Sequence, residues 1–200
     1  MNKKIRNYLY LIGGILVLLG MYLSIFQKEP HFYTFFSLGF LIIFYNIYQS
    51  IKKEKLFRNK KEFLLFSVIL LVECILIDQV GMYLGYWTYQ YTSFFDNLIK
   101  YIFEWAIPFV YSMLLLMTGK EIFKKKFNER TSFVLSLLIF ITLFGLFTEY
   151  INLFSDSWIV LDMPISNYKV GEFFVVFQTI GYWLISFIPW ITYKMVKRIC

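Results

Sequence analysis

Residues 63–86 read FLLFSVILLVECILIDQVGMYLGY, an apolar run whose only charged side chains are Glu73 and Asp78. A helix of about 20 residues rises ~30 Å, which is enough to cross the hydrocarbon core of a bilayer. Five more apolar runs of comparable length lie at residues 8–26, 32–50, 101–119, 132–154 and 173–193. The sequence therefore predicts an all-α integral membrane protein, a six-transmembrane-helix bundle in which residues 1–200 form a single transmembrane domain.

The composition agrees with a membrane protein, because 59% of the 200 residues are hydrophobic and only 16% are charged. The run at 8–26 follows a basic start, as in a signal peptide. Its length and the lack of a small-residue cleavage site favour a helix that is retained. The predicted location is the cell membrane, with several passes.

The basic residues are distributed unevenly between the two ends of the predicted helices. Of the 20 Lys and Arg residues, all except Lys28, Lys100 and Lys169 lie before the first run, between runs two and three or four and five, or after the sixth. This alternation follows the positive-inside rule and predicts that both termini are cytoplasmic. The net charge of +7 then belongs to segments that face the cytoplasm and its anionic lipids, so no nucleic-acid partner is expected.

The two cysteines, Cys74 and Cys200, lie in mid-helix and at the last residue, and the chain has one histidine. This set predicts neither a disulfide nor a metal site, and no cofactor is expected. The oligomeric state is left open.

Four carboxyl groups fall inside the predicted helices, namely Glu73, Asp78, Glu104 and Glu149. A charge at the bilayer centre costs roughly 3 kcal/mol or more, so each of them is a candidate functional residue. At ~1.5 Å per residue, three of the four reach a similar depth in the outer part of the membrane. Simpler interpretations are a snorkelling interfacial Glu104, a structural bond from Glu73 to a neighbouring helix, and a structural pair of Asp78 with Glu149.

A weak internal repeat relates two of these acids. Trp87 follows Asp78 by nine residues, and Trp158 follows Glu149 by nine residues. Each tryptophan precedes an outer loop and a returning helix that contains a proline. The pattern predicts a helix-hairpin repeat, of helices 3–4 and helices 5–6.

Small residues lie at helical spacing beside both acids. Gly81 and Gly85 follow Asp78, and Gly145 lies one turn before Glu149. The first two form a small-xxx-small pattern, which predicts a close approach between helices.

Carboxyl groups away from water can hold a proton and act as general acids. Inside a membrane the natural substrate is an apolar lipid whose double bond or epoxide yields a carbocation on protonation. Aromatic faces stabilise such a cation by roughly 0.5–2 kcal/mol each. We therefore predict Asp78 and Glu149 as catalytic residues, acting without metal. The predicted substrate-binding residues are Glu104, Trp87, Trp105, Asn152, Trp158, Asn167 and Tyr182.

Two stretches carry a resemblance to a family. The first is Asp78-x-x-Gly81-x-x-x-Gly85-x-Trp87-x-Tyr89-x-Tyr91, and the second is Trp158 followed by Met163-Pro164-Ile165-Ser166-Asn167. They are similar to motifs of membrane carotenoid-biosynthesis proteins, and the paired acids resemble those of membrane lycopene cyclases and small membrane terpene cyclases. The resemblance implies an isoprenoid or carotenoid-type substrate and a cyclase, hydratase or isomerase reaction. It implies that Asp78 and Glu149 are the acid and its partner, and that Asn167 lies near the mouth of the site.

Two other classes remain open at this stage. Intramembrane carboxylates also serve as proton relays, so a small proton-coupled transporter or channel is the alternative to an enzyme. A non-catalytic membrane partner protein is the third class, and no sequence pattern indicates it.

Overall fold

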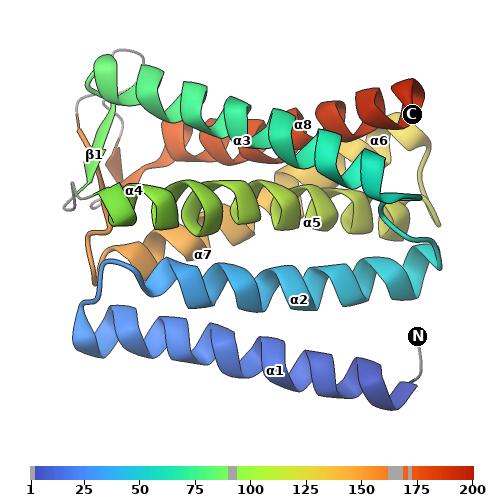
Figure 1. Cartoon of the computed structure of the whole chain (residues 1–200), viewed down its shortest axis with the longest axis horizontal. Helices are drawn as coiled ribbons and strands as arrows, with labels where there is room; N and C mark the ends of the chain where they lie inside the picture. The colour runs from blue at the N-terminus through green and yellow to red at the C-terminus, as the bar shows by residue number, and fades with distance from the viewer. Residues whose placement is uncertain (1–2, 90–93, 162–168, 171–172) are drawn as a thin grey trace.

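The computed structural model describes residues 3–89, 94–161, 169–170 and 173–200. Six long helices lie side by side, and the chain reverses direction between successive helices (Figure 1). The first two helices form one side of the bundle. The other four surround the region where the buried acids lie.

Two of the long helices are interrupted by a π-helical segment, one ends in such a segment, and three are uninterrupted α-helices. The interrupted ones are α4 with η2 and α5 (Phe94–Ile99, Lys100–Ala106, Ile107–Phe123) and α6 with η3 and α7 (Glu129–Leu135, Ser136–Ile141, Thr142–Asn152). Helix α1 (Lys3–Tyr22) ends in η1 (Leu23–Gln27). The uninterrupted ones are α2 (Phe32–Lys52), α3 (Lys60–Tyr83) and α8 (Val175–Ile199).

Five helices of the described chain are long and apolar enough to cross a membrane, and α8 is not among them. The outward faces of these helices carry large apolar side chains, such as Leu11, Leu64 and Leu143, that are at least 60% exposed. Soluble monomers rarely expose apolar surface on this scale, whereas a lipid-facing surface requires it. The architecture is that of a multi-pass membrane protein.

Most helices extend beyond the predicted apolar runs at one end or both, whereas α3 and α7 end before the predicted residues 86 and 154, and α8 begins after the predicted residue 173. The first begins five residues earlier, at Lys3, and the fourth begins seven residues earlier, at Phe94. A polar side chain before a helix can accept hydrogen bonds from its first backbone N–H groups. A helix can therefore begin outside the apolar run of the sequence. Asn59 and Asn128 do this for α3 and α6 by accepting hydrogen bonds from the backbone N–H groups of residues 62 and 131.

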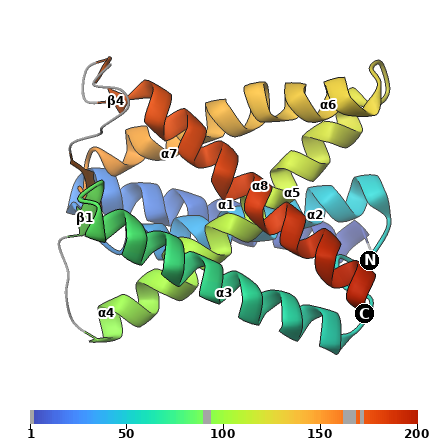
Figure 2. The ribbon, with the colours of Figure 1, turned by 90° about the horizontal axis from the view of Figure 1, so that it is seen from above.

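The central helix is α5, which contacts α2, α6 and α8 and lies in the middle of the bundle in both views (Figures 1 and 2). Phe109, Tyr111, Met113, Leu114 and Leu116 of α5 are essentially inaccessible. A helix that is apolar all round is expected at the centre of a bundle, where neighbours cover every face.

Four short strands lie at the end of the bundle opposite the two termini (Figure 1). Strand β1 (Trp87–Tyr89) pairs antiparallel with β2 (Trp158–Val160), and β3 (Lys169–Val170) pairs with β4 (Phe173–Phe174). Runs this short have no detectable period of two, so hydropathy did not predict them. The β1–β2 ribbon joins the loop after α3 to the loop after α7.

The close helix approach predicted at Gly81 and Gly85 is wrong. Helix α3 ends at Tyr83, and Gly85 lies beyond it with φ of 73°, in the left-handed conformation that glycine favours. The Tyr86 N–H bonds to the Gly81 carbonyl and the Gly85 N–H to the Met82 carbonyl, which is a Schellman ending. The glycines therefore stop the helix and, at Gly81, make room for the Trp87 ring.

Candidate functional site

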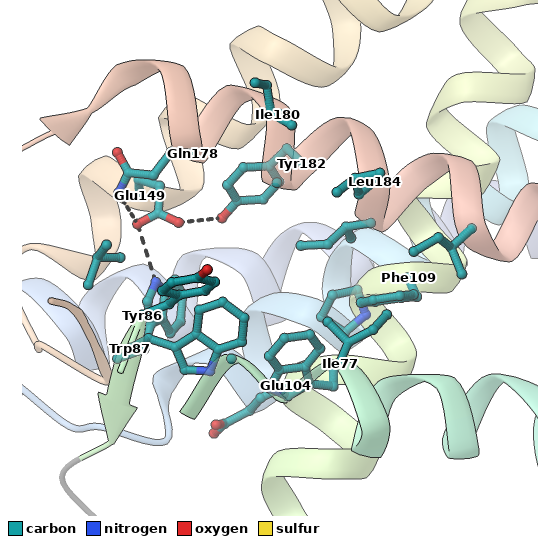
Figure 3. A pocket seen from close by; sticks show the side chains of 18 of the residues that line it. Ile77, Tyr86, Trp87, Glu104, Phe109, Glu149, Gln178, Ile180, Tyr182 and Leu184 are labelled. Atoms are coloured by element: carbon teal, nitrogen blue, oxygen red, sulfur yellow. Dashed lines mark hydrogen bonds between the residues drawn. The ribbon is translucent and has the colours of Figure 1, made fainter. Parts of the chain in front are cut away.

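A cavity of about 520 Å³ lies at the strand end of the bundle, among α3, η2, α5, α7 and α8. Six of the nine predicted site residues line it: Trp87, Glu104, Trp105, Glu149, Trp158 and Tyr182. Figure 3 shows Glu149, Gln178 and Tyr182 together at one end of the cavity, with Ile77, Phe109 and Leu184 at the other. The site therefore has one polar end and an apolar body, as ligand pockets for apolar molecules do.

The cavity opens sideways between α3 and α8. Leu76 and Val80 of α3 and Ile180 and Leu184 of α8 line the cavity, yet these four side chains are 45–59% exposed. The two helices converge near the C-terminus and diverge towards β1 (Figure 2). In a membrane, an opening with an apolar rim faces lipid tails, so an apolar molecule can enter without crossing water.

Glu149 forms the polar end of the cavity and is 7% exposed. Its Oε1 accepts a hydrogen bond from the Tyr182 hydroxyl at 3.0 Å, and its Oε2 accepts from Gln178 Nε2 at 2.9 Å and Trp158 Nε1 at 3.2 Å. No side chain that the structure describes forms an ion pair with Glu149. All its described donors are neutral groups.

Asp78 has a different environment, although both acids are buried. Its Oδ2 lies 3.0 Å from Lys100 Nζ, and its Oδ1 accepts hydrogen bonds from Tyr89 at 2.7 Å and Trp87 Nε1 at 3.0 Å. The Lys100 ammonium is itself buried against the Tyr89 and Tyr101 rings, 4.3 and 4.5 Å from their centroids. Asp78 does not line the cavity. These contacts are those of a paired carboxylate that joins α3, β1 and η2.

The β1–β2 ribbon relates the two acids to each other. In each case the indole N–H of the tryptophan nine residues later bonds to the acid. The register pairs Trp87 with Val160 and Tyr89 with Trp158. Adding 71 to the residue number converts Asp78 to Glu149 and Trp87 to Trp158. Subtracting 71 converts Val160 to Tyr89, so exchanging the two units turns the first pair into the second. The ribbon therefore has the local two-fold arrangement that a repeat of the acid–tryptophan unit produces.

Glu104 is buried in η2 and is paired with a histidine. Its Oε1 lies 3.1 Å from His31 Nδ1, and His31 Nε2 lies 3.2 Å from Asp96 Oδ1. The Glu104 side chain is 2% exposed, so it is not a snorkelling residue at the surface. Because His31 precedes α2, this cluster fastens α2 to α4 and η2. π-Helical segments such as η2 often lie at functional sites, and here the segment turns Glu104 inward.

The His31 cluster predicts a pH-dependent stability. Hydrogen bonding to Glu104, together with the charge of that group and the contact with Asp96, raises the pKa of His31 against the opposing effect of burial. A raised pKa stabilises the fold fully below the unfolded pKa of ~6.5, and this contribution is lost as pH rises through the folded value. Part-exposed pairs contribute ~0.5–1 kcal/mol, which is about 1–4 °C in Tm for a chain of this size. We expect wild-type Tm to fall by this amount between about pH 6 and pH 8.5, and His31→Gln to show no such fall.

Of the other predicted residues that the structure describes, Asp78 and Asn152 do not line the cavity. Asn152 donates a hydrogen bond from Nδ2 to the Trp158 carbonyl at 2.9 Å and so supports the start of β2. Asn167 lies outside the described residues. Glu73 accepts a hydrogen bond from Thr192 of α8 at 2.7 Å, in agreement with the structural interpretation of this acid.

Several residues at the site were not predicted. They are Tyr33, Tyr86, Tyr89 and Gln178, which line the cavity, and Lys100, which pairs with Asp78. Gln178 and Tyr182 are one helical turn apart on α8, and that spacing could have identified Gln178. Lys100 could have been noticed because it is one of the few basic residues on the outer side of the predicted helices.

Comparison of the chain with protein-family models, curated proteins and solved structures finds no match.

Proposed function

We propose that this protein is a membrane-embedded enzyme that protonates an isoprenoid or carotenoid-type lipid, with Glu149 as the general acid. The observation that carries the proposal is the position of Glu149, a buried carboxyl in the wall of a cavity of about 520 Å³ that has aromatic walls and an apolar rim. A carboxyl with neutral donors in a dry site can hold a proton and donate it. The isoprenoid class comes from the sequence resemblance and fits the apolar cavity.

The proposed topology has six membrane crossings, with α8 as the sixth, in the cell membrane. Both termini lie at one end of the bundle, together with the basic segments that follow α2 and α5 (Figure 1). By the positive-inside rule this end is cytoplasmic, so the cavity lies in the outer half of the membrane. The matched acid–tryptophan units support a repeat of two helix hairpins, α3 to α5 and α6 to α8.

In the proposed reaction, the O–H bond of Glu149 breaks as a C–H bond forms at one carbon of a lipid double bond. A tertiary carbocation remains on the lipid, and the carboxylate remains on Glu149. The aromatic rings of the cavity stabilise the cation, and the Tyr182, Gln178 and Trp158 donors stabilise the carboxylate. The carboxylate then removes a proton from an adjacent carbon, which restores a double bond, with or without ring closure. If water attacks the cation instead, Glu149 takes the proton of that water, and the product is an alcohol.

Gln178 fits both protonation states of the acid. Its Nε2 donates to Glu149, and its Oε1 is buried without a hydrogen-bond partner among the described residues. Rotation of the amide by half a turn presents Oε1 to Glu149, where it accepts a hydrogen bond from the protonated acid.

The proposal assigns Asp78 a structural role instead of the catalytic role that the sequence predicted. Its oxygens already accept two hydrogen bonds and a buried ion pair, so protonation would leave the Lys100 charge unpaired in a dry site. A substrate in the cavity would contact Trp87 and Tyr89. Asp78 accepts a hydrogen bond from each of these two side chains and so fixes their positions.

A proton-coupled transporter is the alternative proposal, since it would use the same carboxyl of Glu149. A transport path also needs polar groups toward the other face of the membrane. The deeper acid, Glu73, is tied to Thr192 at 2.7 Å. Proton-driven uptake by reconstituted vesicles, lost in Glu149→Gln, would favour the transporter.

The enzyme proposal predicts that Glu149→Gln loses product formation. General acid catalysis contributes a factor of about 10²–10⁴, so we expect product per folded protein to fall about 100-fold or more. The assay expresses the chain in a host that makes polyprenyl or carotenoid precursors and examines lipid extracts by mass spectrometry. When membranes from cells grown in ordinary water are incubated with the precursor in deuterated water, the wild-type product should gain deuterium.

Glu73→Gln is the matched control, because it removes a carboxyl of the same bundle outside the cavity wall and keeps an acceptor for Thr192. It should form product as the wild type does. A wild-type extract without new product, or an undiminished yield from Glu149→Gln, would show that the proposal is wrong.

A further inference from the structure

The three buried acids near the strand end of the bundle differ in their partners. Asp78 pairs with Lys100 at 3.0 Å, and Glu104 pairs with His31 at 3.1 Å. Glu149 receives three hydrogen bonds from neutral groups, and no cationic side chain that the structure describes lies within ion-pair distance. When Glu149 is ionised, its negative charge can therefore be balanced by one cation bound beside it in the cavity.

The chain itself shows which kind of cation such a site accepts. At Asp78, the ammonium of Lys100 lies against the faces of Tyr89 and Tyr101, 4.3 and 4.5 Å from the ring centroids. The unit shifted by 71 residues repeats the acid and the tryptophan donor. There the acid faces an open cavity walled by aromatic side chains. A carboxylate beside aromatic rings is the arrangement that binds organic ammonium and phosphonium ions.

From this arrangement we infer that the cavity binds hydrophobic monocations, with the positive charge beside Glu149 and the apolar groups along the cavity towards the rim between α3 and α8. The ligand class is a cationic amphiphile, and neutral lipids of the same shape bind more weakly. The inference rests on the role proposed for Glu149 as the acid of the cavity, and it does not require the reaction.

A cation and a proton would compete for the same carboxyl, so binding should weaken as pH falls. The groups that face Glu149 are Tyr182 and Gln178 of α8, Trp158 of β2 and, from α2, Tyr33, which lines the same cavity. Glu104 also lines the cavity, with its Oε1 3.1 Å from His31 Nδ1, and His31 loses its proton as pH rises, so only the pH dependence that Glu149→Gln abolishes belongs to Glu149. The carboxyl of Glu149 is therefore the group whose protonation removes the binding partner of the cation.

The test measures binding of tetraphenylphosphonium to the purified full chain in detergent, by equilibrium dialysis and by quenching of the tryptophans that line the cavity. Triphenylphosphine oxide is the neutral comparison compound. Loss of one partner of a buried charge pair lowers affinity by about 30-fold or more. We expect Glu149→Gln to lose this much affinity for the phosphonium and none for the oxide. Glu149→Asp, which keeps the charge, should retain most of it, and Glu73→Gln should equal the wild type.

Three results would overturn the inference: no saturable phosphonium binding by the wild type, equal affinity in Glu149→Gln, or affinity that does not fall between about pH 8 and pH 5. The outcome is separable from that of the proposed reaction. A chain that binds the cation and makes no lipid product supports this inference alone. A chain that makes product and does not bind the cation supports the reaction alone.

Discussion

Lys100→Met is expected to destabilise the protein by about 3–5 kcal/mol, because it leaves the Asp78 carboxylate buried without its cation. Asp78 is 0% and Lys100 1% exposed, with 3.0 Å between Oδ2 and Nζ. For a chain of this length the loss corresponds to a decrease in Tm on the order of 10 °C. Thermal unfolding in detergent, followed by size-exclusion chromatography of the heated samples, measures it.

Two further variants show whether the ion pair is the cause. Asp78→Asn combined with Lys100→Met removes both charges and keeps an oxygen for the Tyr89 and Trp87 donors, so stability should return to within about 2 kcal/mol of wild type. Lys52→Met breaks a part-exposed pair, Lys52 with Glu121 at 2.8 Å, and should cost no more than ~1 kcal/mol. Equal losses for Lys100→Met and Lys52→Met, or no recovery in the double variant, would contradict the structural role of Asp78.

The same ion pair explains why the fourth helix was predicted to begin too late. Hydropathy counts Asp96 and Lys100 as exposed charges, and the predicted run therefore began after them, at residue 101. In the structure their partners, His31 and Asp78, come from segments 65 and 22 residues away. Tertiary pairing cancels each charge, and no local pattern in the sequence carries that information.

The acids could be identified as candidates from the sequence because a charged side chain inside the hydrocarbon core is costly and therefore rare. The depth estimate placed Asp78, Glu104 and Glu149 in one layer, and the structure puts Glu104 and Glu149 in the wall of one cavity. The nine-residue spacing to Trp87 and Trp158 predicted matched units, and each indole bonds to its acid.

What the sequence could not separate was the role of each acid. Asp78 and Glu149 have similar helical neighbours, and the difference lies in one cation from η2 at the first and the α8 amide and hydroxyl at the second. These partners depend on how helices distant in sequence pack. One sequence by itself gives no indication of that packing.

Gly81→Ala and Gly145→Ala are expected to cost about 3 kcal/mol each, which is large for a single methyl group. A Cβ at Gly81 would lie 2.0 Å from the Trp87 ring, and one at Gly145 would lie 2.5 Å from Cγ of Tyr182. Overpacking costs ~1–3 kcal/mol, and losing the hydrogen bond from the displaced ring to its buried acid costs ~1–3 kcal/mol more. Gly14→Ala in α1 meets no atom within 4 Å, so it should be neutral or stabilise by about 0.5–1 kcal/mol.

Gly145 allows the Tyr182 hydroxyl to reach Glu149 at 3.0 Å. A double-mutant cycle with Tyr182→Phe tests that link, since Phe keeps the ring and removes the hydroxyl. If the alanine already displaces the ring, Tyr182→Phe should cost less in the Gly145→Ala background than in the wild type, with a coupling of about 1 kcal/mol. Strictly additive losses would mean that Gly145 and the hydroxyl act separately, and that the geometry around Glu149 does not depend on this helix contact.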